Sequence, residues 1–186
     1  MTAITRTKQV NGWRIGRWSA AAALLCVPAI AMRFTGEVDW TASDFAVMGV
    51  LLTAILSVYE LLASRAQSVT YRAASTLTTL GLFLLIWINL AVGIIGHEGN
   101  PANLMFAGVI AILTGGACIA RFEPGGMART LFIAAGAQLI IGVITLAGDL
   151  GAEGPGWPRD VIALTIFFTG LWAVAGVLFK LAGERR

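Results

Sequence analysis

The chain has 186 residues, of which 58% are hydrophobic and only 12% are charged. A soluble domain carries about 25% charged residues, so this composition excludes an ordinary water-soluble domain and predicts a protein solvated by lipid. The net charge is +3, but the basic residues cluster at the ends of apolar runs, without interleaved aromatic residues, which argues against a nucleic-acid partner.

Six apolar runs follow one another along the chain, each bounded by charged residues or by Gly and Pro. A membrane-spanning helix needs about 20 apolar residues, and its backbone groups must pair within the helix. The sequence therefore predicts an all-α integral membrane protein with six transmembrane helices arranged as three consecutive helical hairpins. The domain would cover residues 18–182, with basic tails at 1–17 and 183–186. The runs are Trp18–Phe34, Phe45–Ala63, Ala73–Gly96, Ala102–Ala120, Thr130–Gly148 and Val161–Ala182.

The charges between the runs alternate in sign and predict the topology. Eleven Lys and Arg residues lie in the two tails, at the end of the last run and in the second and fourth loops, whereas two lie in the first, third and fifth loops. Because basic residues near helix ends remain on the cytoplasmic side, both termini are expected there.

The first run also allows a different interpretation. Basic residues followed by a short apolar segment and Ala29-Ile30-Ala31 are typical of a cleavable signal peptide. Cleavage would leave five helices. The two cysteines, Cys26 and Cys118, lie in separate runs and are expected to be small buried side chains without a disulfide.

Three segments resemble a known family. They are residues 31–45 (AMRFTGEVDWTASDF), 87–105 (WINLAVGIIGHEGNPANLM) and 120–132 (ARFEPGGMARTLF). They are similar to a family of small multi-spanning bacterial inner-membrane proteins with no assigned activity. The resemblance implies an intact protein of the bacterial inner membrane and supplies no catalytic residues.

Polar residues within the apolar runs indicate the first candidate site. Asn89, Gly93 and His97 are spaced to share one face of a continuous helix, with Glu98 and Asn103 close by in the sequence. A histidine there could sense pH or pass protons. The alternative is an exposed histidine with Asn103 capping the following helix. One histidine is too few for a metal site of three or four ligands, and no cofactor is expected.

Glu60 marks a second candidate, because a carboxylate near a helix end in lipid should find a cation. The expected partners are Arg65, Arg72 and Arg121. The alternative is a proton or substrate site that faces the cytoplasm.

Small residues recur at helical spacing on the fourth and fifth runs. They let helices approach closely, and the amide of Gln138 could bridge two of them. All five small residues are expected to face other helices. They are Ala107, Ala111, Gly115, Ala134 and Gly142.

Two functions remain open at this stage. The first is a non-enzymatic accessory or scaffold component that binds other membrane proteins or itself. The second is a small transporter or channel coupled to protons or cations, with Glu60, Asn89 and Gln138 along its path. Transporters combine broken helices with several polar groups near mid-membrane, and this chain shows few of either, so the first function is favoured. No motif supports an enzyme.

Overall fold

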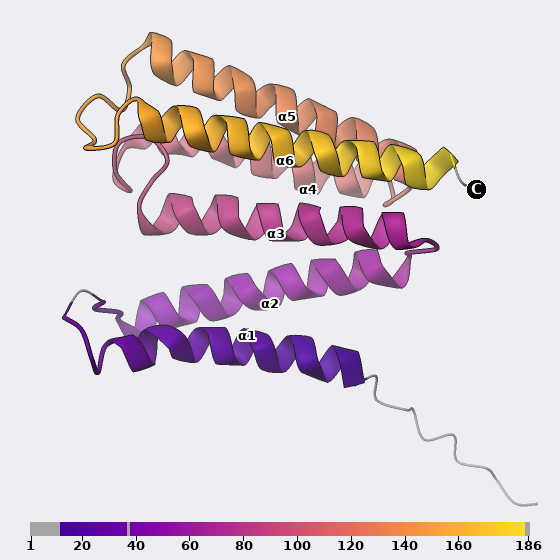
Figure 1. Ribbon diagram of the computed structural model, residues 1–186, viewed down its shortest axis with the longest axis horizontal. Coiled ribbons are helices and arrows are strands. Elements are labelled where there is room, and N and C mark those ends of the chain that lie inside the picture. The colour runs from indigo at the N-terminus through magenta and orange to yellow at the C-terminus, as the bar shows by residue number, and fades with distance from the viewer. Residues whose placement is uncertain (1–11, 37, 185–186) are drawn as a thin grey trace, which may run out of the picture. The chain divides into compact units, whose positions relative to one another are not determined.

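The computed structural model describes residues 12–36 and 38–184, and this part of the chain consists of helices and turns (Figure 1). Five helices are long and apolar enough to cross a membrane when the 3₁₀ turn η1 is counted with α4. The prediction of an all-α chain suited to a multi-pass membrane protein is therefore confirmed. The helices are α1 (Gly12–Ala31), α2 (Ala42–Ser64), α3 (Val69–Ala91), η1 (Pro101–Leu104), α4 (Met105–Ile119), α5 (Pro124–Ala147) and α6 (Arg159–Glu184).

The helix at the N-terminal end starts earlier than predicted. α1 begins at Gly12 and includes Arg14 and Arg17, which the sequence analysis had placed in a tail. Arginine has a high helix propensity, so a charged turn can extend an apolar helix. Several residues used in the charge analysis lie outside the described residues, namely Arg6, Lys8, Glu37, Arg185 and Arg186.

The prediction that one helix continues to Gly96 is wrong. α3 ends at Ala91, and Gly93 and Gly96 follow with φ angles of +72° and +71°. Glycine adopts this left-handed region without steric cost, so the two glycines turn the chain out of the helix.

Local side chains define where two other helices begin. At the start of α2, the Thr41 amide donates to the Asp44 carboxylate at 2.7 Å, and the Asp44 amide donates to the Thr41 hydroxyl at 3.4 Å. This reciprocal pair satisfies amides that have no partner within the helix. The Ser68 hydroxyl accepts from the Tyr71 amide and caps α3 in the same way.

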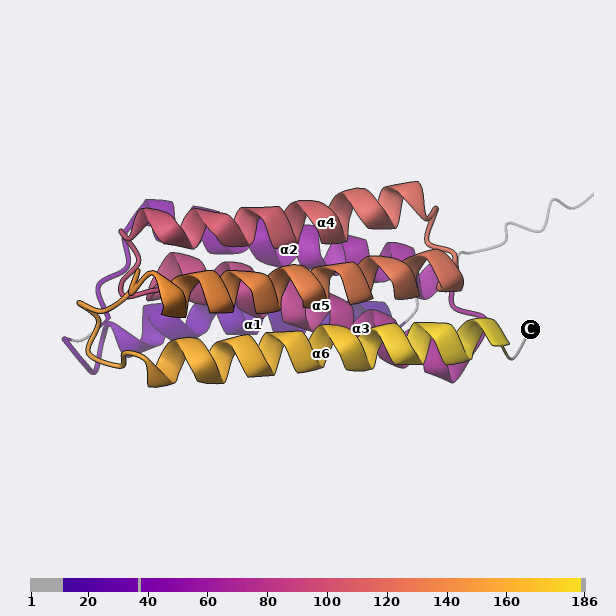
Figure 2. The same cartoon turned by 90° about the horizontal axis from the view of Figure 1, so that it is seen from above.

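The chain divides into two compact units, residues 1–56 and 57–186, and α2 contributes to both. In the second unit α6 packs between α3 and α5, and α4 packs on the other side of α5 (Figures 1 and 2). The predicted α5–α6 hairpin is a closely packed pair. The described residues of the consecutive helices α3 and α4 share no extended interface, so they do not form the predicted hairpin.

Two glycines allow α6 to approach its neighbours closely. A methyl group on Gly81 of α3 would lie 2.8 Å from the ring of Trp172, which is fully buried. A methyl group on Gly142 of α5 would lie 2.5 Å from the side chain of Thr165. Real side chains do not tolerate such distances, so both positions require glycine for this packing.

The small residues on α5 and on α4 differ in whether they are buried. Ala134 and Gly142 are buried against other helices, as predicted. Ala107, Ala111 and Gly115 are exposed, so the prediction for α4 is wrong. α4 instead turns its larger apolar side chains toward the bundle, where they gain van der Waals contacts with neighbouring helices. These are Phe106, Val109 and Leu113.

The two cysteines are also exposed, contrary to the expectation that they are buried. Cys26 and Cys118 are both free thiols on outward faces of their helices. For a helix in lipid the outward face is as apolar as the interior, so hydrophobicity alone does not show which side faces the core.

Candidate functional site: three polar clusters

The Asn103 side chain organises the loop between α3 and α4, residues 92–104. Its carbonyl oxygen accepts from the amides of Ile94 and Ile95 at 3.0 and 2.9 Å. Its amide nitrogen donates to the carbonyls of Ile95 and His97 at 3.2 and 2.8 Å. One half-buried side chain thus satisfies backbone groups on both sides of the turn, which is a structural role.

Asn100 links this loop to the α5–α6 loop. Its side chain accepts from the Ala102 amide, capping η1, and donates to the Leu150 carbonyl at 2.7 Å. Gly154 packs against the backbone of Gly96. A methyl group built on Gly154 would lie 2.8 Å from the Gly96 Cα. The two loops are therefore fastened together at one end of the second unit. The sequence analysis did not predict this link.

The other predicted members of the polar site do not share one helix face. His97 lies in the loop with its side chain exposed, and its Nδ1 accepts from the Gly99 amide at 3.1 Å. Glu98 is also exposed. Asn89 remains on α3, where its side chain donates to the Leu85 carbonyl at 2.8 Å. The predicted line of Asn89, Gly93 and His97 on one helix is wrong because α3 ends at Ala91.

A second cluster surrounds the α4–α5 turn, residues 120–123, at the opposite end of this unit. The Arg65 guanidinium donates to the Arg121 carbonyl at 2.8 Å and lies 5.0 Å from the centre of the Phe122 ring. The Tyr71 hydroxyl donates to the Phe122 carbonyl, also at 2.8 Å. Two side chains from more than 50 residues away thus hold adjacent carbonyls of one turn.

The backbone of this turn is strained. Arg121 and Phe122 have φ angles of +50° and +63°, although neither is glycine. This region costs a non-glycine residue roughly 1–2 kcal/mol. Such a conformation persists when surrounding contacts determine it, and here the Arg65 and Tyr71 hydrogen bonds do so.

The predicted ion pair of Glu60 with Arg65, Arg72 or Arg121 stays a prediction. Glu60 is half-buried on α2. The contacts of Arg65 show a role that the sequence analysis did not foresee, because a hydrogen bond to a backbone carbonyl has no signature in charge patterns.

The third group, called here the polar seam, consists of buried polar atoms on two closely packed helices: Gln138 and Thr145 on α5, and Thr169 and Trp172 on α6. Contacts of Gly142 with Thr165 and of Gly176 with Phe132 fix the antiparallel register of the two helices. One turn from the first contact, Gln138 lies level with Thr169.

The polar atoms of this seam lack partners within the described part of the chain. Gln138 and Trp172 are fully buried. Neither atom of the Gln138 amide is hydrogen-bonded there, nor are the Trp172 indole nitrogen and the hydroxyls of Thr145 and Thr169. By contrast, the hydroxyls of Ser75, Thr78 and Thr79 on α3 each donate to a carbonyl four residues earlier. The sequence identified Gln138 as the central polar residue but missed Trp172 and Thr169, which count as members of an apolar run.

Comparison with known proteins finds no match for this chain. No family model, curated protein or solved structure matches the chain. Within residues 12–36 and 38–184, no three His, Cys, Asp or Glu side chains lie together in a way that could hold a metal ion.

Replacing Asn103 with Ala should destabilise the protein by about 2–3 kcal/mol, because four hydrogen bonds to the loop backbone are lost. The matched variant His97→Ala should change stability by less than about 0.5 kcal/mol, because its ring is exposed. Reversible unfolding in mixed micelles measures both. Equal losses for the two variants would show that the loop does not depend on Asn103.

Replacing Gln138 with Leu should stabilise the protein by about 1–3 kcal/mol, since a buried amide without partners is exchanged for an apolar side chain of similar size. Thr78→Val is the control: its hydroxyl is hydrogen-bonded, so that change should be nearly neutral. The same unfolding assay applies. A destabilised Gln138→Leu protein would mean that the amide has a polar partner in the membrane.

Proposed function

We propose that this chain is a non-enzymatic accessory or scaffold component of a bacterial inner membrane, which binds a helix of another membrane protein or of a second copy through α4. The observation that carries the proposal is the outward-facing row of small residues on that helix. Ala107, Ala111 and Gly115 follow one another at four-residue spacing and are exposed.

Small side chains on an outward helix face gain little from contact with lipid. No heavy atom lies within 4 Å of a methyl group built on Gly108 or Gly115, so this face is unfilled by the described chain. In a bilayer, helices associate mainly through close packing, which small side chains at four-residue spacing permit. The row therefore supports association with a further transmembrane helix.

The proposed topology has six membrane-spanning helices, both termini in the cytoplasm and no cleavage of α1. The charge difference between the loops supports the orientation. α1 is not among the five helices that are long and apolar enough to cross a membrane, and its proposed span rests on its length of 20 residues, about what the hydrocarbon core requires.

A second candidate function is a small proton- or cation-coupled transporter, and the polar seam favours it. Unpaired polar groups inside a membrane bundle often mark a transport path. Gln138→Leu separates the two functions: a scaffold keeps its partner after this change, whereas a transporter loses ion flux in proteoliposomes.

Reporter fusions test the topology. A reporter inserted after Gly99 should be active only outside the cytoplasm, and one placed after Arg186 only inside it, because the third loop and the C-terminus are expected on opposite sides. Activity of both reporters in the same compartment would contradict the six-span arrangement.

Filling the row on α4 tests the accessory function. Gly115→Leu should reduce recovery of a bound partner, or of a dimer, by about tenfold, because the larger side chain prevents close helix approach. Co-purification from native membranes in mild detergent, with light scattering for the dimer, provides the measurement. Gly136→Leu is the matched control, since Gly136 is also exposed with open space around it but lies on α5. The proposal fails if wild-type protein is monomeric and alone, or if both variants behave alike.

A further inference from the structure

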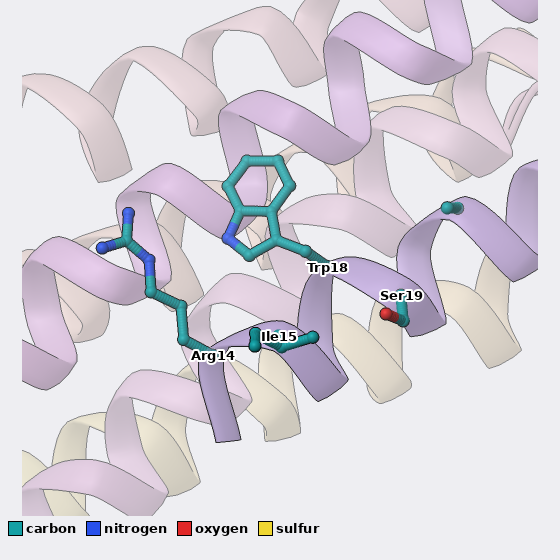
Figure 3. Close-up of a pocket in the computed structure, with 5 residues that line it drawn as sticks. Arg14, Ile15, Trp18 and Ser19 are labelled. Atoms are coloured by element: carbon teal, nitrogen blue, oxygen red, sulfur yellow. The ribbon is translucent and has the colours of Figure 1, made fainter. Parts of the chain in front are cut away.

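The first unit contains a groove along α1 that has one charged end. Its wider part, about 600 Å³, is lined by Arg14, Ile15, Trp18, Ser19 and Ala22 (Figure 3). Its narrower part, about 190 Å³, lies between α1 and α2 and is lined mostly by apolar residues, among them Leu25, Gly49 and Leu52. Trp18 and Ala22 line both parts, so the two parts adjoin along α1.

The narrow part exists because α2 has a glycine where it faces α1. A methyl group on Gly49 would lie 3.9 Å from the Leu25 side chain, which is an ordinary contact distance. A larger side chain at this position would extend into the space between the helices. Gly49 therefore leaves room for a slender apolar ligand.

Two hydrogen-bond donors stand at the wide end. Arg14 and Trp18 are one turn apart and rise from the same side of α1, with the indole nitrogen turned toward the guanidinium (Figure 3). A guanidinium carries five N–H donors and an indole carries one, so this end suits a ligand with several acceptor oxygens and negative charge. Among the described residues, neither Asp nor Glu lines either part of the groove.

The length of the groove indicates what kind of molecule fits. Eleven residues separate Arg14 from Leu25, which corresponds to about 16 Å along a helix. That is roughly half of the 30 Å hydrocarbon core, or one leaflet. A transmembrane helix of a partner would need a groove along the full span, whereas one lipid occupies one leaflet.

We propose that this groove is a binding site for one anionic phospholipid. The phosphate oxygens accept hydrogen bonds from Arg14 and Trp18, and an acyl chain lies along Ala22, Leu25 and Gly49. Arginine and tryptophan are the side chains that favour the headgroup level of a membrane, which suits this placement. The site is independent of the α4 row and of the accessory function.

Native mass spectrometry of the full chain, titrated in detergent with phosphatidylglycerol or phosphatidylcholine, tests the proposal. One phosphatidylglycerol should bind about tenfold more tightly than phosphatidylcholine, because phosphatidylcholine has the same phosphate oxygens but carries a trimethylammonium group that repels the Arg14 guanidinium. Arg14→Gln should abolish most of this preference, and Trp18→Phe, which keeps the ring but removes a donor to the phosphate, should weaken the binding of both lipids. Gly49→Leu should weaken both lipids by blocking the acyl chain.

Arg33→Gln is the matched control, because it removes the same charge just beyond the other end of α1. It should leave the preference unchanged. Equal loss in Arg14→Gln and Arg33→Gln would mean that net charge alone attracts the lipid, and would overturn the proposal. So would an unchanged preference in Arg14→Gln, or unchanged binding in Gly49→Leu. Circular dichroism of each variant verifies that the helices are intact, and Trp18→Phe tests the headgroup contact if Arg14→Gln does not fold.

Discussion

The second unit depends on the close approach of α6 to the helices on either side of it. Gly81 makes room for the Trp172 ring on the α3 side, and Gly142 makes room for Thr165 on the α5 side. In lipid there is no hydrophobic force to bring apolar helices together, so such close contacts must supply the attraction. Each glycine removes a side chain where the partner is large or branched. The order of packing, with α6 between α3 and α5, follows from these two positions.

Some polar groups in this unit are hydrogen-bonded, and others are buried without a partner among the described residues. At both ends, side chains satisfy the backbone of irregular turns: Asn103 holds the α3–α4 loop, and Arg65 and Tyr71 hold the α4–α5 turn. Along α3, hydroxyls donate to carbonyls of their own helix. Within the described residues of this unit, buried polar atoms without partners occur in the seam of α5 and α6, among them both amide atoms of Gln138, and at the side-chain oxygen of Asn89 on α3. The ends of the unit are therefore the parts most firmly specified by hydrogen bonds.

The sequence predicted the helices well and their packing poorly, for physical reasons. Runs of apolar residues identify helices in lipid because the length needed to span a membrane is fixed, and the six predicted runs correspond to α1–α6. In those runs the inward and outward faces are equally apolar, so the direction in which Ala107 or Ala111 points has no signature. The Arg65 contact with the Arg121 carbonyl joins residues 56 apart and depends on a turn with positive φ angles at non-glycine residues, which no local pattern indicates. His97 was correctly noticed as the only histidine, but its place on a helix was wrong because two glycines end α3 before it.

The position of α6 has a consequence for how the protein is made. α3, α4 and α5 leave the ribosome before α6, yet α6 is the helix that joins α3 to α5. Until it has been synthesised, Gly81 on α3 and Gly142 on α5 face lipid or the insertion machinery rather than their native neighbours. α3 therefore lacks its main packing partner in this unit until α6 is present, whereas α4 and α5 can already pack against each other. Assembly of the unit is complete only when α6 has been inserted.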